Sequence, residues 1–396
     1  IDSAAHVAMA APSFSIRYWN KTPDEFLYRA CELVRLGYGY PAMYNDEVII
    51  PAMMNRGIPL KDARQYCIIG CVEPQVPHKT EGWHAAFFNI AKVLDVTLHN
   101  GRNGKLQLGP KTGEMKDFKN LGELMLAYKQ QMEYFVRLLA EADNCVDYAH
   151  MERAPLPYLS ALVDDCIGRG KSVQEGGAIY NFTGPQAFGV ADNGDSFAAI
   201  QKHVFEKKEV TMEQLFDAIN HNFGYADETG KIEQWFGNGC CESNASIEGM
   251  DERQIYEAVK RILSANGSID INQFQKDIQS GTTKTQAPAA AGDATQYQNI
   301  KRIMENTTWF GNDDDFVDQI TREAGQIYAR EVQKYKNPRG GQFLPCICQC
   351  SLRERCCTAS RWPSGVDSAC RWRISSCRLR YQRPDSSIYV RCQART

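Results

Sequence analysis

The sequence has 396 residues, with 45 basic and 48 acidic side chains and a formal net charge of −3. Its hydrophobic fraction of 43% excludes a chain that is disordered throughout, and its near-neutral charge gives no argument for nucleic acid or an anionic membrane as a partner. The sequence contains no apolar run of about 18 residues, so we expect no membrane-spanning helix. Its first residues lack the pattern of a signal peptide.

Amino-acid usage changes near residue 345. Residues 1–345 hold seven of the fifteen cysteines, and residues 346–396 hold the other eight. These last residues also carry ten arginines against three acidic side chains, a charge of +7 that leaves −10 for the rest. We therefore predict a body over 1–345 and a foreign tail over 346–396. Seven thiols dispersed through a large body are typical of a reduced compartment, which predicts a cytoplasmic location.

The first half of the body is predicted to alternate helices with short apolar runs. Residues 22–36 show the helical spacing of apolar side chains, with Thr22 as the N-cap in a capping box. Two apolar runs, at 47–54 and 67–69, are predicted to form buried strands. The other predictions for this half are helical turns at 60–66, a loop at 70–84, and helices at 85–98 and 117–143.

The second half of the body is predicted to continue this alternation. We expect a strand at 177–184, a loop at 185–195, a helix that Asp195 caps and that runs to about Lys207, a flexible segment at 281–296, and a helix that ends near Tyr335. Strands, loops and helices in this order indicate an α/β architecture in layers, with the chemistry on loops at strand ends.

The loop at 70–84 holds the residues best suited to chemistry. Cys71 and Glu73 are two residues apart, and side chains with this spacing point to the same side of an extended segment. A thiol and a carboxylate would then share one small space. Cysteine suits both burial and radical or nucleophilic chemistry. A buried cysteine beside a solvated glutamate is nevertheless the commoner outcome of a C-x-E pattern.

The segment around this pattern resembles the glycyl radical enzymes, the pyruvate formate-lyase-like family. The resemblance covers roughly residues 1–345 and corresponds to the middle and later part of a longer enzyme. Its motifs are Gly70-Cys71-Val72-Glu73-Pro74, Lys79, Glu81-Gly82-Trp83-His84, Phe87-Phe88-Asn89, and the runs at 180–189, 310–318 and 337–343.

The resemblance implies a fold, a radical and partners. The fold is α/β: a partial ten-stranded α/β barrel, with helices outside and the Cys loop inside. The radical is stored on a glycine of the full-length enzyme, where a radical S-adenosylmethionine activating enzyme with an iron–sulfur cluster installs it. A small-molecule substrate and a homodimer of the full-length protein are also implied, whereas no bound cofactor and no metal site are expected.

The resemblance also assigns roles to residues. Cys71 would be the thiyl site, and Glu73 the general base that removes the hydroxyl proton of the substrate radical. A ketyl radical anion expels a β leaving group more readily than its protonated form, so a carboxylate beside the thiyl group suits an elimination. His84 and Tyr180 are predicted to bind substrate, with a solvated ring for His84 and core packing for Tyr180 as the alternatives.

Three functional hypotheses remain open from the sequence. The main one is a glycyl radical lyase or dehydratase, although the diol dehydratases have an Asp after the motif His, where this chain has Ala85. The second is a formate C-acetyltransferase-like enzyme. That chemistry uses two adjacent cysteines in the loop, and the vicinal pair Cys240-Cys241 lies away from the motif. The third is a non-catalytic interaction chain or pseudogene product.

Two remaining features are given simpler interpretations. The acidic run 313–315 is predicted to cap the helix that follows it rather than to bind a metal. The cysteines of the tail lack the paired spacing of structural zinc sites.

The Arg-Trp pairs at 361–362 and 371–372 fit family segments read in a shifted frame, so we predict an unstructured, out-of-frame tail. No R-V-x-G-Y segment for the radical glycine is found, so we expect this chain alone to be inactive.

Overall fold

The structure, a computed structural model, describes residues 1–6, 14–35, 40–70, 73–81, 84–224, 291–347, 378–380 and 391–393. The helices used below are α2 (Asp24–Arg35), α3 (Asp46–Met54), α4 (Leu60–Ala63), α5 (Ile90–Leu98), α6 (Leu121–Arg153), α7 (Pro157–Leu162), α8 (Cys166–Arg169), α9 (Val190–Ile200), α10 (Met212–Asn220), α14 (Ala291–Glu305) and α15 (Asp315–Val332). The strands are β1 (Ser15–Tyr18), β2 (Ala42–Asn45), β3 (Cys67–Ile69), β4 (Glu73–Gln75), β5 (His84–Asn89), β6 (Arg102–Asn103), β7 (Leu106–Gln107), β8 (Gly184–Phe188), β9 (Cys346–Ile347), β10 (Arg378–Arg380) and β11 (Arg391–Gln393).

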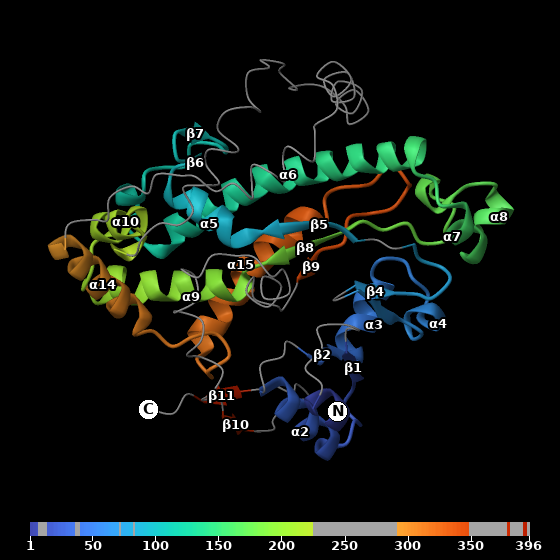
Figure 1. Cartoon of the computed structure of the whole chain (residues 1–396), viewed down its shortest axis with the longest axis horizontal. Helices are drawn as coiled ribbons and strands as arrows, with labels where there is room; N and C mark the ends of the chain where they lie inside the picture. The colour runs from blue at the N-terminus through green and yellow to red at the C-terminus, as the bar shows by residue number, and fades with distance from the viewer. Residues whose placement is uncertain are drawn as a thin grey trace, which may run out of the picture.

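Helix α6 spans the molecule and supplies one wall of the main core (Figure 1). Its N-terminus is capped by Asn120, whose side chain accepts a hydrogen bond from the backbone N–H of Glu123. From Leu124 to Ala140, every fourth residue of the helix is apolar and buried, and this spacing places these side chains on one face. The stripe consists of Leu124, Tyr128, Met132, Val136 and Ala140.

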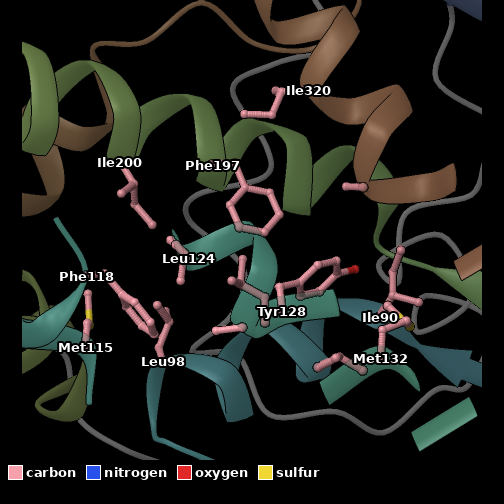
Figure 2. Close-up of a cluster of buried hydrophobic side chains, with 14 of the residues drawn as sticks. Ile90, Leu98, Met115, Phe118, Leu124, Tyr128, Met132, Phe197, Ile200 and Ile320 are labelled. Carbon is pink, nitrogen blue, oxygen red and sulfur yellow. The ribbon is translucent and has the colours of Figure 1, made fainter. Parts of the chain in front are cut away.

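The main core lies between α6 and the helices α5, α9 and α15. The ring of Tyr128 meets the ring of Phe197 edge to face, with 5.3 Å between the centroids (Figure 2). Asn193 secures the same contact, because its amide donates to the Tyr128 hydroxyl at 2.8 Å and to the carbonyl of Ile90 at 3.0 Å. Helices far apart in the sequence are thus joined by both apolar packing and a buried polar link.

A three-stranded parallel sheet, in the order β5-β8-β9, lies against this core. Successive residues of a strand face opposite sides, so β8 presents Ala187 to one side and Gln186 to the other. The Ala187 side is the helical one, since Ala187 belongs to the main core and its neighbour Phe88 stacks on Tyr328 of α15. Gln186 and its partner Phe87 therefore face away from these helices.

The N-terminal part has a smaller core of its own. The strands β1 and β2 pair in parallel, and the strands β3 and β4 form an antiparallel hairpin. Both lie with α2, α3 and α4 in the blue region of Figure 1. Phe182, which comes from the segment before β8, joins this second cluster and connects it to the sheet. The cluster consists of Met53, Ile58, Ala63, Tyr66, Val76 and Phe182.

Several predicted elements are confirmed, with shifted ends. The helices predicted at 22–36, 60–66 and 117–143 correspond to α2, α4 and α6, and the short strand at 67–69 is β3. Thr22 does not show the predicted capping bond, because its hydroxyl accepts from the backbone N–H of Trp19 at 2.9 Å. Ile69 of β3 is 45% exposed, so the prediction of a buried strand is wrong there.

Two predictions in the first half are wrong about the type of element. Residues 47–54 form helix α3 rather than a strand, because Asn45 caps the helix by accepting from the N–H of Glu47 and acidic residues fill its first turn. Residues 84–89 form strand β5, and the helix α5 starts only at Ile90, where Asn89 provides the cap. In both cases an asparagine cap, rather than the apolar pattern, marks where the helix begins.

The predictions around β8 are also wrong. The strand expected at 177–184 begins only at Gly184, and the loop expected at 185–195 is strand β8 followed by helix α9. Gly189, with a φ of 90°, makes the abrupt change from strand to helix. Asp195 lies inside α9 instead of capping it, and its carboxylate accepts from the N–H of Phe310 at 2.6 Å.

The later predictions have mixed outcomes. The acidic run caps α15 as predicted, since the side chain of Asp314 accepts from the N–H groups of Phe316 and Val317. Of the segment predicted to be flexible, 291–296 belongs to α14, and 281–290 lies outside the described residues. The Cys240-Cys241 pair also lies outside them.

The described strands form five small sheets, and none of these sheets closes on itself. The helical layer lies on one side of the largest sheet, as the α/β prediction requires, while the ten-stranded barrel stays a prediction. Strand β9 adds Cys346 and Ile347 to this sheet, whereas the sequence predicts that both residues belong to the unstructured tail. The tail boundary at 345 also stays a prediction. Within the described part of the chain, no helix is long and apolar enough to cross a membrane.

Candidate active site

The hairpin β3–β4 carries the C-x-E pattern. Ile69 and Glu73 face each other as the last pair of the hairpin, and Gly70 follows with a positive φ of 63°. Glu73 therefore begins a strand instead of lying in the predicted loop. Cys71 lies outside the described residues, in sequence between Gly70 and Glu73. The structure thus gives the positions of the Glu73 carboxylate and of Gly70, the residue that precedes Cys71 in the sequence.

The Glu73 carboxylate is buried against Gly70. Glu73 is 3% exposed, which contradicts the alternative of a solvated glutamate. A Cβ atom placed on Gly70 would come within 3.0 Å of the Glu73 Oε2 atom. A side chain at position 70 would therefore push the carboxylate away, and it would also be strained at this φ. Glycine at this position lets the carboxylate lie directly over the backbone next to Cys71.

Gln186 contacts the other oxygen of the same carboxylate. Its Nε2 group donates a hydrogen bond to the Glu73 Oε1 atom. Gln186 is 1% exposed and lies on β8, the central strand of the parallel sheet. The sheet face opposite the helical core is therefore the face that receives the β3–β4 hairpin. Sequence reasoning missed Gln186, because it placed this residue in a loop.

Tyr180 lies in a partly buried polar cluster beside the smaller core. Its hydroxyl donates to the Asp62 Oδ2 atom at 2.8 Å, and the Lys79 ammonium group donates to Oδ1 at 2.7 Å. The hydrogen bonds from Lys79 and Tyr180 lower the pKa of Asp62. Burial, together with the neighbouring carboxylate, raises the pKa of Tyr180 to about 12. The tyrosine is thus a neutral donor that is already engaged with Asp62.

His84 and the residues before it connect the hairpin to the sheet. His84 is the first residue of β5 and pairs with Gly184 of β8, so it does not begin a helix as its structural alternative assumed. Thr80 forms a parallel bridge with Tyr180, and the Tyr180 N–H donates to the carbonyl of Lys79 at 2.9 Å. The four predicted site residues are therefore drawn from two neighbouring chain segments.

A second buried cluster centres on Arg339, in the motif at 337–343. Its guanidinium group pairs with Glu81, donates to Asp147 at 2.9 Å, and donates to the Thr183 hydroxyl at 2.7 Å. The Arg339 side chain is 7% exposed, and burial lowers its pKa to about 10. This single arginine ties the segment before β5, the helix α6 and the segment before β8 together.

Asn337 and Gly341 complete this junction. The Asn337 amide donates to the carbonyl of Asn181 and to the Thr183 hydroxyl, both at 2.8 Å. Gly341 lies so close that an added Cβ atom would come within 1.4 Å of the Asn181 carbonyl oxygen. The motifs at 180–189 and 337–343 therefore support the site by holding the backbone before β8.

No metal site accompanies these clusters in the described part of the chain, where no group of three or more His, Cys, Asp or Glu side chains could hold an ion. The chemistry available to the described residues is that of one buried, hydrogen-bonded carboxylate, on a residue that lies two positions after Cys71 in the sequence. Such a carboxylate can accept a proton in an environment that excludes water.

The model of the family described as "Pyruvate formate lyase-like" matches residues 1–353. The chain is 30% identical over 348 residues to (2S)-3-sulfopropanediol dehydratase of Klebsiella oxytoca. The aligned region covers 87% of this chain and 34% of the relative. It thus spans about a third of the length of this relative.

Two solved structures are similar in both sequence and fold. The glycerol-bound B12-independent glycerol dehydratase of Clostridium butyricum is 43% identical, with a TM-score of 0.61 over 87% of this chain and 35% of that one. A solved structure that concerns 1,2-propanediol dehydration in Roseburia inulinivorans is 40% identical, with a TM-score of 0.63 over 87% of this chain and 35% of that one. The chain therefore belongs to the pyruvate formate lyase-like family of glycyl radical enzymes.

Proposed function

We propose that this chain is the part of a glycyl radical lyase or dehydratase that holds the thiyl cysteine, Cys71, and the general base, Glu73. In the full-length enzyme it would act on a small hydroxylated substrate and eliminate a β leaving group. The observation that carries the proposal is the position of the Glu73 carboxylate, buried over Gly70 and hence one residue from Cys71. The dehydratases among the similar proteins support the same class of reaction.

The glycyl radical of the full-length enzyme would supply the hydrogen-atom abstraction that oxidises the Cys71 thiol to a thiyl radical. Cys71 then takes a hydrogen atom from the carbon that bears the substrate hydroxyl group. Glu73 accepts the hydroxyl proton, which leaves a ketyl radical anion. The bond to the β leaving group breaks, and the anion departs with the bonding electron pair.

The reaction closes without a net change in oxidation state. The carbonyl-stabilised product radical takes the hydrogen atom back from Cys71, which regenerates the thiyl group. The proton held by Glu73 leaves with the departing anion, as water when the leaving group is hydroxide. Substrate is thereby converted into a carbonyl compound and the protonated leaving group, and both Cys71 and Glu73 return to their starting states.

The roles of His84 and Tyr180 are narrower proposals. His84 starts the strand next to β8 and would bind a polar group of the substrate. Tyr180 would contribute indirectly, because its hydroxyl is engaged by Asp62. A radical S-adenosylmethionine activating enzyme is the proposed partner, and the cytoplasm is the proposed location.

The test uses a full-length version of the protein, incubated without oxygen with an activating enzyme and S-adenosylmethionine. We expect a panel of vicinal diols and sulfo- or amino-alcohols to contain a substrate that yields an aldehyde or ketone. Cys71→Ser should abolish turnover while the glycyl radical signal in electron paramagnetic resonance persists. Formation of formate from a 2-oxo acid, with no elimination product, would favour the acetyltransferase hypothesis instead.

Glu73→Gln separates the base from the radical chemistry. We expect it to lower kcat by a factor of about 100 or more, the usual contribution of a general base. Exchange of hydrogen between Cys71 and the substrate carbon should continue, because this step does not need the carboxylate. Exchange followed by mass spectrometry in a deuterated buffer would show this. Normal turnover in Glu73→Gln would contradict the assignment of Glu73.

A further inference from the structure

We propose that His99 is a pH-sensitive link that holds the C-terminal ends of helices α5 and α10 together. His99 directly follows α5, and Asn220 is the last residue of α10. The two residues are 121 positions apart in the sequence, so the contact between their side chains exists only in the folded chain. The inference is independent of the proposed function, because neither residue belongs to the candidate active site.

Both nitrogen atoms of the His99 ring face oxygen atoms. Nδ1 lies 2.7 Å from the carbonyl oxygen of Asp95 and 3.3 Å from the Oδ1 atom of its carboxylate. Nε2 lies 2.9 Å from the Oδ1 atom of Asn220. A carbonyl or carboxylate oxygen can only accept a hydrogen bond, so both ring nitrogens make their contacts as donors. A ring with two N–H groups is a cation, and the neutral ring would lose one of these two contacts.

The surroundings of His99 favour the cation. The ring lies at the C-terminal ends of two helices, where the unpaired carbonyl groups give a partial negative charge. Its side chain is 20% exposed, and the ring packs against that of Phe216 on α10, with 5.0 Å between the centroids. The hydrogen bonds with Asp95 and Asn220 outweigh the effect of burial and raise the pKa of His99 from 6.5 to about 9.

The other titratable groups around this link carry charges of both signs, and several pair with one another. Arg102 pairs with Glu114 at 2.9 Å, and Asp217 pairs with His221 at 3.2 Å. The acidic partner of His99 is Asp95, which His99 shares with a lysine one turn earlier on α5. The full set is Lys92 and Asp95 on α5, Arg102 on β6, Glu114, Lys116 and Asp117 at the 3-10 helix η1 (Met115–Asp117), and Asp217, His221 and Tyr297 around α10.

The direction of the pH dependence follows from the raised pKa. A histidine in the unfolded chain releases its proton near pH 6.5, whereas His99 in the folded chain keeps it up to about pH 9. The stabilisation that the proton provides is therefore complete below pH 6.5 and is lost progressively as pH rises to about 9. Above that value the neutral ring has one donor for two acceptors, so α10 is held less tightly against the end of α5.

The first experiment measures the charge of His99 by nuclear magnetic resonance, with the seven histidines of the 396-residue chain labelled with carbon-13. The resonance that is missing in His99→Gln belongs to His99, and it should titrate near pH 9. Asn220 is exposed, so its variants should fold. Asn220→Asp should move the midpoint upward by about one unit and Asn220→Leu should move it downward. A midpoint near pH 6.5 in the wild-type chain, or one that neither variant moves, would overturn the link.

The second experiment measures how firmly α10 is held, by hydrogen exchange and mass spectrometry of its peptides, corrected for the intrinsic effect of pH. In the wild-type chain, protection of α10 should fall by a factor of about 10 between about pH 7 and about pH 10. His99→Gln should be less protected at pH 7 and should not show this fall.

His221→Gln is the matched control for the second experiment. His221 also follows a helix directly and also bonds to the carbonyl of an aspartate four residues earlier, but its side chain is 48% exposed. This variant should keep the fall in protection that the wild-type chain shows. An equal fall in His99→Gln and in the wild-type chain would show that His99 does not control the docking of α10, and would overturn the proposal.

Discussion

At the scale of single residues, the candidate site depends on carboxylates that the fold removes from water. Glu73 and Asp62 are both buried, and each has donors from segments remote in the sequence. A carboxylate without such partners would be costly to bury. The glutamine and tyrosine that supply them therefore serve stability and site geometry together.

Tyr180→Phe tests the role of the Tyr180 hydroxyl. The substitution removes one of the two donors to Asp62, so we expect the free energy of unfolding at pH 7 to fall by about 1–3 kcal/mol. Urea titration of the wild-type and variant chains measures this difference. An unchanged stability combined with a raised KM would instead support a direct contact between Tyr180 and the substrate.

The pH dependence of this cluster follows from Asp62. Its hydrogen bonds with Lys79 and Tyr180 lower its pKa from 3.8 in the folded state. The folded state therefore releases the proton more readily than the unfolded state does. The resulting stability is complete above pH 3.8 and is lost as pH falls through the lower folded value. Asp62→Asn should remove this part of the acid sensitivity, as urea titrations at pH 7 and pH 3 would show.

At the scale of elements, the segments before β8 and before β9 are locked together by their backbones. Gly341→Ala tests this contact. The added methyl group would collide with the Asn181 carbonyl, so we expect a loss of about 1–3 kcal/mol or more in the free energy of unfolding. Gly168→Ala in α8 is the matched control, because its added Cβ atom meets only an Asp165 side-chain oxygen at 3.5 Å. Equal losses of unfolding free energy in the two variants would show that the close contact between Gly341 and the Asn181 carbonyl is not important for stability.

The sequence predicts these elements unevenly, and for physical reasons. Helix α6 has a long apolar stripe and α15 an acidic cap, so both are predictable from local signals. The strand β8 is buried throughout its length and shows no alternation, and a glycine separates it directly from a helix. Burial by helices from elsewhere in the chain, which no local pattern encodes, decides its conformation.

The same reasoning explains what was missed in the site. Cys71 and Glu73 were found because they lie two residues apart in a specific motif. Gln186 and Asp62 come from other segments, and only the packing of β8 and α4 brings their side chains to Glu73 and Tyr180. A hydrogen bond between residues more than a hundred positions apart leaves no periodic signal in a single sequence.

At the scale of the whole molecule, one charged cluster joins the helical layer to the side of the sheet that carries the site. Arg339 pairs with Asp147 of α6 and with Glu81, which precedes β5. Removing one member of a buried ion pair leaves an uncompensated charge, at a cost of about 3–5 kcal/mol. We therefore expect Arg339→Met to lower the free energy of unfolding by this amount. A change below about 1 kcal/mol, typical of an exposed ion pair, would show that the Arg339 cluster does not stabilise the junction between the helical layer and the sheet.

Asp143 makes the stability of the whole chain depend on pH in the opposite direction to Asp62. It lies one helical turn before Asp147 on α6, and its Oδ2 atom has no hydrogen-bond partner among the described residues. Burial, together with the charge of Asp147, raises its pKa from 3.8 to about 7. The folded state thus binds the proton more tightly than the unfolded state. The stability that comes from this proton is present below pH 3.8 and is lost progressively as pH rises to about 7.

Asp143→Asn tests this dependence, because an amide of the same shape has no proton to lose. Above pH 7 the wild-type chain must bury the charged carboxylate, so the variant should be more stable at pH 8 by about 1–3 kcal/mol. At pH 4 the aspartic acid is already neutral in the folded state, and the two chains should differ little. Urea titrations across this range measure the difference, with Asp165→Asn at the exposed start of α8 as the control. A variant that loses stability equally at both pH values would contradict this prediction. Such a loss would show that Asp143 is an ionised, paired carboxylate, like Asp147, and that two ionised aspartates of α6 lie at this junction rather than one.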